Sequence, residues 1–155
     1  MREIRDKLFE LTNFYQEQLS LYGQIQEVGS EEQELIRAGQ LDRLLAILKD
    51  KEGLLTKAGE YEQRIKGVQD QLAAHFDLET FSLPQLKLVA PEYYQKELQE
   101  LEVAVSELLP VLESLEEQER RNEEALSTYL EAVQGPKTKT AQIRRAGRAY
   151  GKKSR

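Results

Sequence analysis

The groups in this sequence that could do chemistry are mostly carboxylates, and their spacing puts them on helix faces. Residues three or four apart on a helix are neighbours, and one such cluster contains Glu113, Glu116, Glu117 and Glu119. Paired carboxylates can transfer protons or hold a metal ion, but helical di-metal sites add histidines three residues further on. The chain has a single histidine, His75. We therefore interpret the carboxylates as a solvated helix face and predict no metal site.

Other catalytic arrangements are missing from the sequence as well. It contains no cysteine, which excludes thiol nucleophiles, disulfides and cysteine-containing zinc sites. It has no glycine-rich phosphate loop, no His-Glu-x-x-His motif and no nucleophile elbow. His75 falls at the end of a predicted helix, where the helix dipole favours a histidine without any catalytic role. We predict that the protein is not an enzyme and has no catalytic residues, no cofactor and no small-molecule substrate.

The charge of the chain is divided unevenly along its length. The net charge is −6, but residues 1–136 carry 28 acids and 14 bases, whereas residues 137–155 carry eight bases and no acid. The second segment is poor in large apolar side chains and follows Gly135-Pro136, a double helix stop. We predict a helical domain at 1–136 and a disordered, flexible basic tail at 137–155.

The basic tail could bind nucleic acid or an anionic membrane, because clustered bases displace counterions from phosphates. The acidic body would repel such a polyanion, and Tyr150 is the one aromatic residue among the tail's bases. We therefore predict no nucleic-acid partner and no stable membrane insertion, which leaves a solvated tail or a docking arm for an acidic protein. The chain also lacks a long apolar run and an apolar signal segment, so we predict a cytoplasmic protein.

Apolar residues recur every three or four positions over most of the chain, which is the spacing of amphipathic helices. This pattern predicts three long helices at residues 4–37, 40–76 and 92–134. Gly39 should end the first helix in a left-handed conformation. A connection this short leaves open whether the first two helices form a hairpin or one kinked rod.

Several residues predict local departures from regular helix. Gly29-Ser30 could break the first helix, because Ser30 is placed to begin a capping box. Ser82 and Pro84 predict a short helical turn at 82–90, with Ser82 as its cap. Pro110 should kink the third helix, since it lacks the N–H that a helix interior needs. We predict an all-α fold: an elongated antiparallel bundle of three long amphipathic helices with coiled-coil-like seams.

Polar residues occupy a few seam positions of these helices. Gln18 and Lys51 lie in the first and second seams, and Glu119 and Asn122 lie in the third. A polar seam residue costs stability but can fix helix register or the number of partners. Alternatively, the third helix beyond Asn122 is unpacked in the unbound protein and exposes an apolar surface for a partner helix. That surface would contain Leu126, Tyr129, Leu130 and Val133.

The order of these features resembles the FlgN-type flagellar export chaperones and, less closely, the FliT-type chaperones. A long first helix is followed by Gly39, a Leu-x-x-Leu-Leu segment and Lys51. Then come a proline-containing Ser-Leu-x-x-Leu turn beginning at Ser82 and a heptad helix with Asn-x-x-x-Leu beginning at Asn122. The aromatic residue near the end of the tail, Tyr150, is also similar to these chaperones. The resemblance covers nearly the whole chain.

This resemblance implies a cytoplasmic chaperone that binds the C-terminal helices of hook-filament junction proteins. It would keep these clients unassembled and deliver them to an export gate component. The seam around and beyond Asn122 indicates the client-binding residues, which we expect to be Asn122, Leu126, Tyr129, Leu130 and Val133. Ile143 and Tyr150 in the tail are candidates for contact with the client or the export gate.

A structural coiled-coil protein is the main alternative. In such a homo-oligomeric rod or scaffold the seams would close on themselves and leave no apolar surface for a client. The chaperone hypothesis allows either a monomer or a weak homo-oligomer. The two hypotheses therefore differ in whether self-association or client binding covers the third helix.

Overall fold

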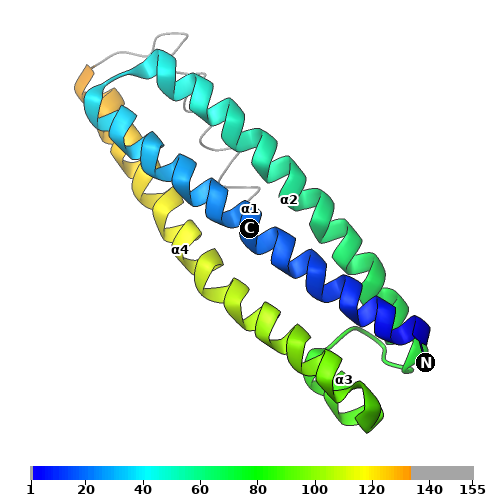
Figure 1. Ribbon diagram of the computed structural model, residues 1–155. Helices are drawn as coiled ribbons and strands as arrows, with labels where there is room; N and C mark the ends of the chain where they lie inside the picture. Colours follow the sequence, from blue (N-terminus) through cyan, green and yellow to red (C-terminus); the bar gives the residue numbers. More distant parts are fainter. Residues whose placement is uncertain (1, 134–155) are drawn as a thin grey trace. The chain divides into compact units, whose positions relative to one another are not determined.

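Three long helices make up most of the structure. The computed structural model describes residues 2–133, and Figure 1 shows its helices in chain order. They are α1 (Arg2–Ala38), α2 (Leu41–His75), α3 (Leu83–Val89), the 3-10 helix η1 (Glu92–Tyr94) and α4 (Gln95–Val133). The prediction of an all-α fold built on three long helices is confirmed, and the 3-10 helix η1 is added to it. The predicted tail and the boundary before residue 137 lie outside the described residues.

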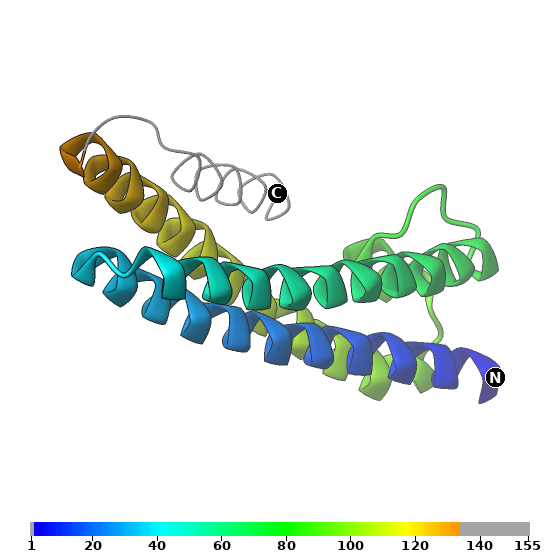
Figure 2. The ribbon, with the colours of Figure 1, turned by 90° about the horizontal axis from the view of Figure 1, so that it is seen from above.

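The break between α1 and α2 is the one that the sequence predicts. Gly39 has a φ of 69°, a left-handed conformation that glycine adopts without a steric penalty. The N–H groups of Gly39 and Gln40 donate to the carbonyls of Ile36 and Leu35, which closes the end of α1. Figure 2 shows α2 running back along α1 after this turn, so the two helices form a hairpin.

The predicted break at Gly29-Ser30 is wrong, because α1 continues through both residues. The Ser30 hydroxyl donates to the carbonyl of Gln26 one turn earlier in the same helix and caps nothing. Gly29 is tolerated in the helix interior for a reason outside α1. The amide of Gln118 lies where a Cβ of residue 29 would be.

The predicted turn at 82–90 is the short helix α3. The hydroxyl of Ser82 accepts a hydrogen bond from the N–H of Gln85 and caps the helix, and Pro84 lies in its first turn. Leu86 is fully buried, which ties this helix to the core around it. His75 is the last residue of α2, as expected for a favourable interaction with the helix dipole.

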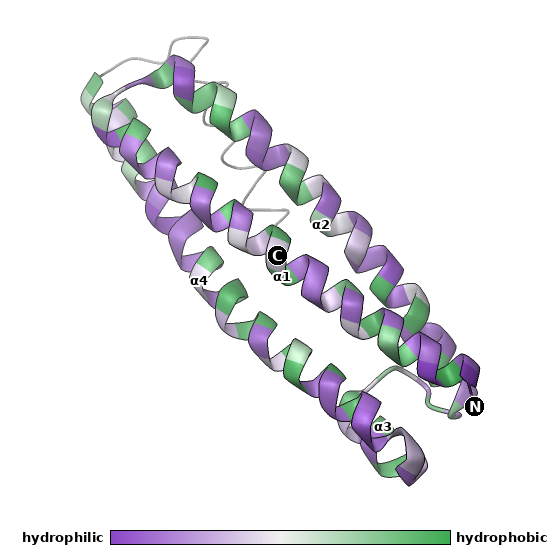
Figure 3. Cartoon of the chain, in the orientation of Figure 1, coloured by the Kyte–Doolittle hydropathy of each residue, from purple (hydrophilic) through white to green (hydrophobic). Residues whose placement is uncertain are grey.

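The described residues divide into two compact units, and each contains parts of all three long helices. Residues 2–20 and 58–110 form unit 1, and residues 21–57 and 111–133 form unit 2. The division within α4 falls directly after Pro110. Figure 3 shows apolar and polar residues alternating around the helices of both units, as expected of amphipathic helices.

Unit 1 has a continuous apolar core between α1, α2, α3 and α4. Contacts between α1 and α2 fix their antiparallel direction: the Lys7 ammonium donates to Gln71, and Gln69 donates to the Tyr15 hydroxyl at 2.7 Å. Arg5 pairs with Glu97 of α4. The buried members of this core are Ile4, Leu8, Leu11, Ile65, Val68, Leu72, Leu86, Tyr94, Leu98 and Leu101.

Unit 2 has a smaller apolar core near the α1–α2 turn. Its buried members are Leu35, Ile36, Leu44, Leu48, Leu126 and Leu130. Beside this core, unit 2 buries several polar side chains, which unit 1 does to a smaller extent. In the part of the chain that the structure describes, no helix is long and apolar enough to cross a bilayer.

Candidate functional site

The candidate residues from the third seam lie at the end of α4 in unit 2, and most of them are packed. Asn122 is 2% exposed, and its side-chain amide donates to the carbonyl of Gly29 at 2.9 Å. Leu126 and Leu130 are buried in the unit 2 core. The alternative in which this end of α4 is unpacked in the unbound protein is therefore wrong for these two leucines. Their contact with a client stays a prediction.

Tyr129 and Val133 differ from the other candidates because they reach the surface. Tyr129 is half-buried against the unit 2 core, and Val133 is 51% exposed. The Tyr129 ring and hydroxyl lie against Gly39, with the hydroxyl 3.0 Å from the position that a Cβ would take there. The turn glycine thus makes room for the aromatic ring. The two tail candidates, Ile143 and Tyr150, lie outside the described residues.

Three charged side chains meet inside unit 2, one from each long helix. The Lys51 ammonium of α2 lies 3.0 Å from a carboxylate oxygen of Glu32 in α1 and also pairs with Glu119 of α4. The Lys51 side chain is only 1% exposed, and both carboxylates are nearly buried. Charges removed from water are tolerated only when they are paired, so each member depends on the others.

Burial raises the pKa of Glu32 above its ordinary value. Attraction to Lys51 and the hydrogen bond from its ammonium lower this pKa, and repulsion by Glu119 raises it again. Two carboxylates share one ammonium here, so the group carries an excess negative charge when all three are ionised. The loss of hydration is the larger effect on Glu32.

Two amide side chains of α4 attach to the backbone of α1 beside these charges. The Gln118 amide donates to the carbonyl of Gln26 at 3.0 Å, one turn before the bond from Asn122 to Gly29. The oxygen of the same Gln118 amide is buried and has no hydrogen-bond partner within residues 2–133. We call Glu32, Lys51, Gln118, Glu119 and Asn122 together the polar layer.

Sequence reasoning identified part of the polar layer and missed the rest. Lys51, Glu119 and Asn122 were visible as polar residues at seam positions, and Gln18 in unit 1 follows the same rule by donating to the Ala58 carbonyl. Glu32 and Gln118 lie beside their seams and gave no such signal. Gly29 pointed to a helix break, whereas its structural role is to admit Gln118.

A surface cavity of about 370 Å³ lies beside the polar layer and the apolar core of unit 2. Its walls come from α1 and α4, and the lining residues are Gln33, Ile36, Arg37, Ala125, Thr128 and Tyr129. Ile36, Ala125 and Tyr129 make one part of the lining apolar. Such a cavity can accept an apolar side chain of a bound helix.

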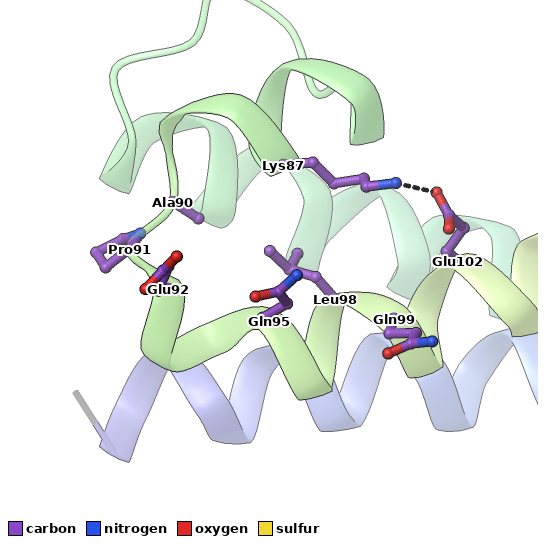
Figure 4. Close-up of a pocket in the computed structure, with 8 residues that line it drawn as sticks. All are labelled: Lys87, Ala90, Pro91, Glu92, Gln95, Leu98, Gln99 and Glu102. Carbon is purple, nitrogen blue, oxygen red and sulfur yellow. Dashed lines mark hydrogen bonds and ion pairs between the residues drawn. The ribbon is translucent and has the colours of Figure 1, made fainter.

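Unit 1 contains a second cavity of about 460 Å³, between α3 and the start of α4 (Figure 4). An ion pair between Lys87 and Glu102 spans it, and Gln95 and Gln99 line its α4 side. These side chains offer no nucleophile with an adjacent base. In the described part of the chain, no three acidic or histidine side chains are grouped as a metal site would require.

The fold and these sites define a helical protein whose buried polar groups hold helices against one another beside an apolar cavity. This arrangement suits a protein that binds other helices. The chain belongs to the FlgN family, because the family model described as FlgN protein matches residues 1–155. The chain is therefore a flagellar export chaperone, as its resemblance to this family implied. Comparison with curated proteins and with solved structures gave no significant match.

Proposed function

We propose that this chaperone binds the C-terminal helices of hook-filament junction proteins in the cytoplasm. Binding covers the client's apolar helix face, prevents premature assembly and keeps the client ready for delivery to the export gate. The observation that carries this proposal is the cavity of unit 2, which lies between α1 and the end of α4. Helix-in-groove recognition needs an apolar surface of this kind and no catalytic group.

The exposed residues at this end of α4 make the first contact with the client. Tyr129 lines the cavity and Val133 is exposed one turn further on, so a client helix that crosses the end of α4 can bury both. Leu126 and Leu130 support this surface from the core, and a direct contact with them would require the client to enter unit 2. Asn122 holds the supporting helix in place.

The basic segment 137–155 gives the chaperone a second binding region. Its eight bases and the acidic body carry opposite charges, so the two parts suit different partners. We assign the contact with an export component to this segment, with Ile143 and Tyr150 as its apolar anchors. The same two residues could instead extend the client-binding surface, and substitution of each separates these roles.

A matched pair of substitutions on α4 tests the client surface. Val133 in unit 2 and Val103 in unit 1 are both 51% exposed, so replacing either with aspartate should leave the fold intact. Val133→Asp puts a charge into the proposed interface and should weaken binding of a junction-protein C-terminal peptide at least about tenfold, or 1.4 kcal/mol. Val103→Asp should bind like the wild type. Isothermal titration measures both affinities, and equal affinities for the two variants would contradict the proposal.

The structural coiled-coil alternative makes a different prediction for the same preparation. A homo-oligomer that covers the end of α4 would give one stable self-associated species by light scattering and no added mass with the junction protein. The chaperone proposal predicts a complex of the two proteins that replaces any weak self-association.

A further inference from the structure

We propose that the polar layer positions the residues of the client surface. In this proposal it fixes the axial register of the end of α4 on α1 and α2, and only that register assembles the cavity lined by Tyr129. The inference rests on the proposed client binding for its functional consequence.

Apolar packing alone discriminates weakly between registers of α4. Leu126 and Leu130 pack against further leucines and an isoleucine on α1 and α2. The third seam repeats leucine at this spacing, with Leu108, Leu112 and Leu115 ahead of the polar layer. A shift of α4 by one turn, about 5.4 Å, would place Leu126 where Leu130 packs and so regain part of the leucine contact. Contacts of this kind supply stability but little register.

The polar layer distinguishes the registers that the leucines do not. A one-turn shift would move Glu119 away from Lys51 and leave its nearly buried carboxylate without this counter-ion. It would also remove the bonds from Gln118 to Gln26 and from Asn122 to Gly29. Each loss is costly because the groups are shielded from water.

Gly29 independently favours the same register of α4 on α1. The Gln118 amide occupies the space of the absent Cβ, so it can lie there only against a glycine. The residues one turn away on α1 are Gln26 and Gln33, which carry side chains. A shifted α4 would press Gln118 against one of them.

The register matters for binding because the cavity is shared by two helices. Gln33, Ile36 and Arg37 come from α1, while Ala125, Thr128 and Tyr129 come from α4. The two sets face each other only in the observed register, in which the Tyr129 hydroxyl also lies against Gly39. The affinity of a client that binds this cavity should therefore depend on the position of α4 along α1.

Replacing the charges by apolar residues separates register from stability. We would combine Glu32→Leu, Lys51→Met and Glu119→Leu, because apolar replacement of a buried ionic group is often neutral or stabilising. A second variant, Gln118→Met with Asn122→Leu, keeps the charges and removes only the amide contacts. The control is Lys66→Met with Asp70→Leu, which removes an exposed ion pair of unit 1.

Two measurements are made on the full chain carrying each set of substitutions. Spin labels on cysteines at the exposed positions Glu31 and Glu124 report the distance between α1 and α4 within unit 2, and the wild type has no cysteine to interfere. Isothermal titration with a synthetic C-terminal helix of the organism's junction protein reports affinity. Thermal unfolding of each variant shows whether it is folded.

We expect folded polar-layer variants with a second or broadened distance peak. Their Kd for the peptide should rise about tenfold if about a tenth of the molecules hold the competent register. The control should match the wild type in both measurements. A single unchanged distance peak in both polar-layer variants would overturn the inference, as would wild-type affinity despite a second peak. If the wild type itself fails to bind the peptide, the proposed function fails, and the distance distributions decide the register on their own.

Discussion

Lys51→Met is the substitution that most directly probes the buried charges of unit 2. Methionine fills nearly the same space as the lysine stem, so the change removes the ammonium and little else. It leaves Glu32 and Glu119 nearly buried without their shared counter-ion. Removing one partner of a buried ion pair costs about 3–5 kcal/mol. A domain has a free energy of unfolding of about 5–15 kcal/mol, so this single change should remove a large part of the stability of the protein.

The loss of stability caused by Lys51→Met should depend on pH. The pKa of Glu32 is already raised by burial, and removal of Lys51 takes away the interactions that lower it. Its folded-state pKa in the variant therefore lies higher still, and the folded protein takes up a proton that the unfolded chain releases at the same pH. The penalty of Lys51→Met should be greatest at neutral pH and should shrink as the pH falls toward 5.

Urea unfolding followed by circular dichroism at pH 7 and pH 5 measures both effects. The exposed Lys66 of unit 1, which pairs with Asp70 at 3.3 Å, provides the control. Lys66→Met should change the free energy of unfolding by less than about 1 kcal/mol at either pH. A cost of Lys51→Met no larger than that of this control, or one that is the same at both values of pH, would contradict the role of the buried charges.

Two further predictions concern the same unit. Because the folded-state pKa of Glu32 is raised, this carboxyl group contributes stability that is present below pH 4.5 and is lost as the pH rises through the raised pKa. Glu32→Gln removes this contribution, so the free energy of unfolding of the wild type minus that of the variant should grow on acidification. Urea titrations at several pH values measure this difference, and Glu31→Gln at an exposed position is the matched control. Gly29→Ala should destabilise the protein by about 1–3 kcal/mol, because its Cβ would overlap the Gln118 amide, whereas Gly53→Ala should stabilise it by about 0.5–1 kcal/mol, because no atom lies within 4 Å of its Cβ. Thermal melts of the two alanine variants compare them, and a shift of the same sign in both would contradict the role of Gly29.

The local structure of this chain could be predicted because it depends on nearby residues. Gly39 ends α1 through its own φ angle, and Ser82 and Pro84 start α3 through their own cap and first turn. The long helices follow from the spacing of their apolar residues. Their bounds therefore agree with the sequence to within about three residues.

The contacts between helices could be predicted only in part. Asn122 was recognisable as a polar seam residue, but its acceptor, the Gly29 carbonyl, lies 93 positions away. Glu32 lies beside the first seam, and only the packed unit shows that it faces Lys51. The burial of Leu126 and Leu130 depends equally on which helices close over them. The heptad pattern is the same for a packed leucine and for one that awaits a partner.

The most direct test of the client-binding site is hydrogen–deuterium exchange of the chaperone with and without the junction-protein helix. Complex formation should add protection in the segments that line the unit 2 cavity, 33–37 and 125–129, and from there to the exposed Val133. Amides of unit 1 should exchange as they do in the unbound protein. Protection confined to unit 1, with none at the end of α4, would contradict the proposed site.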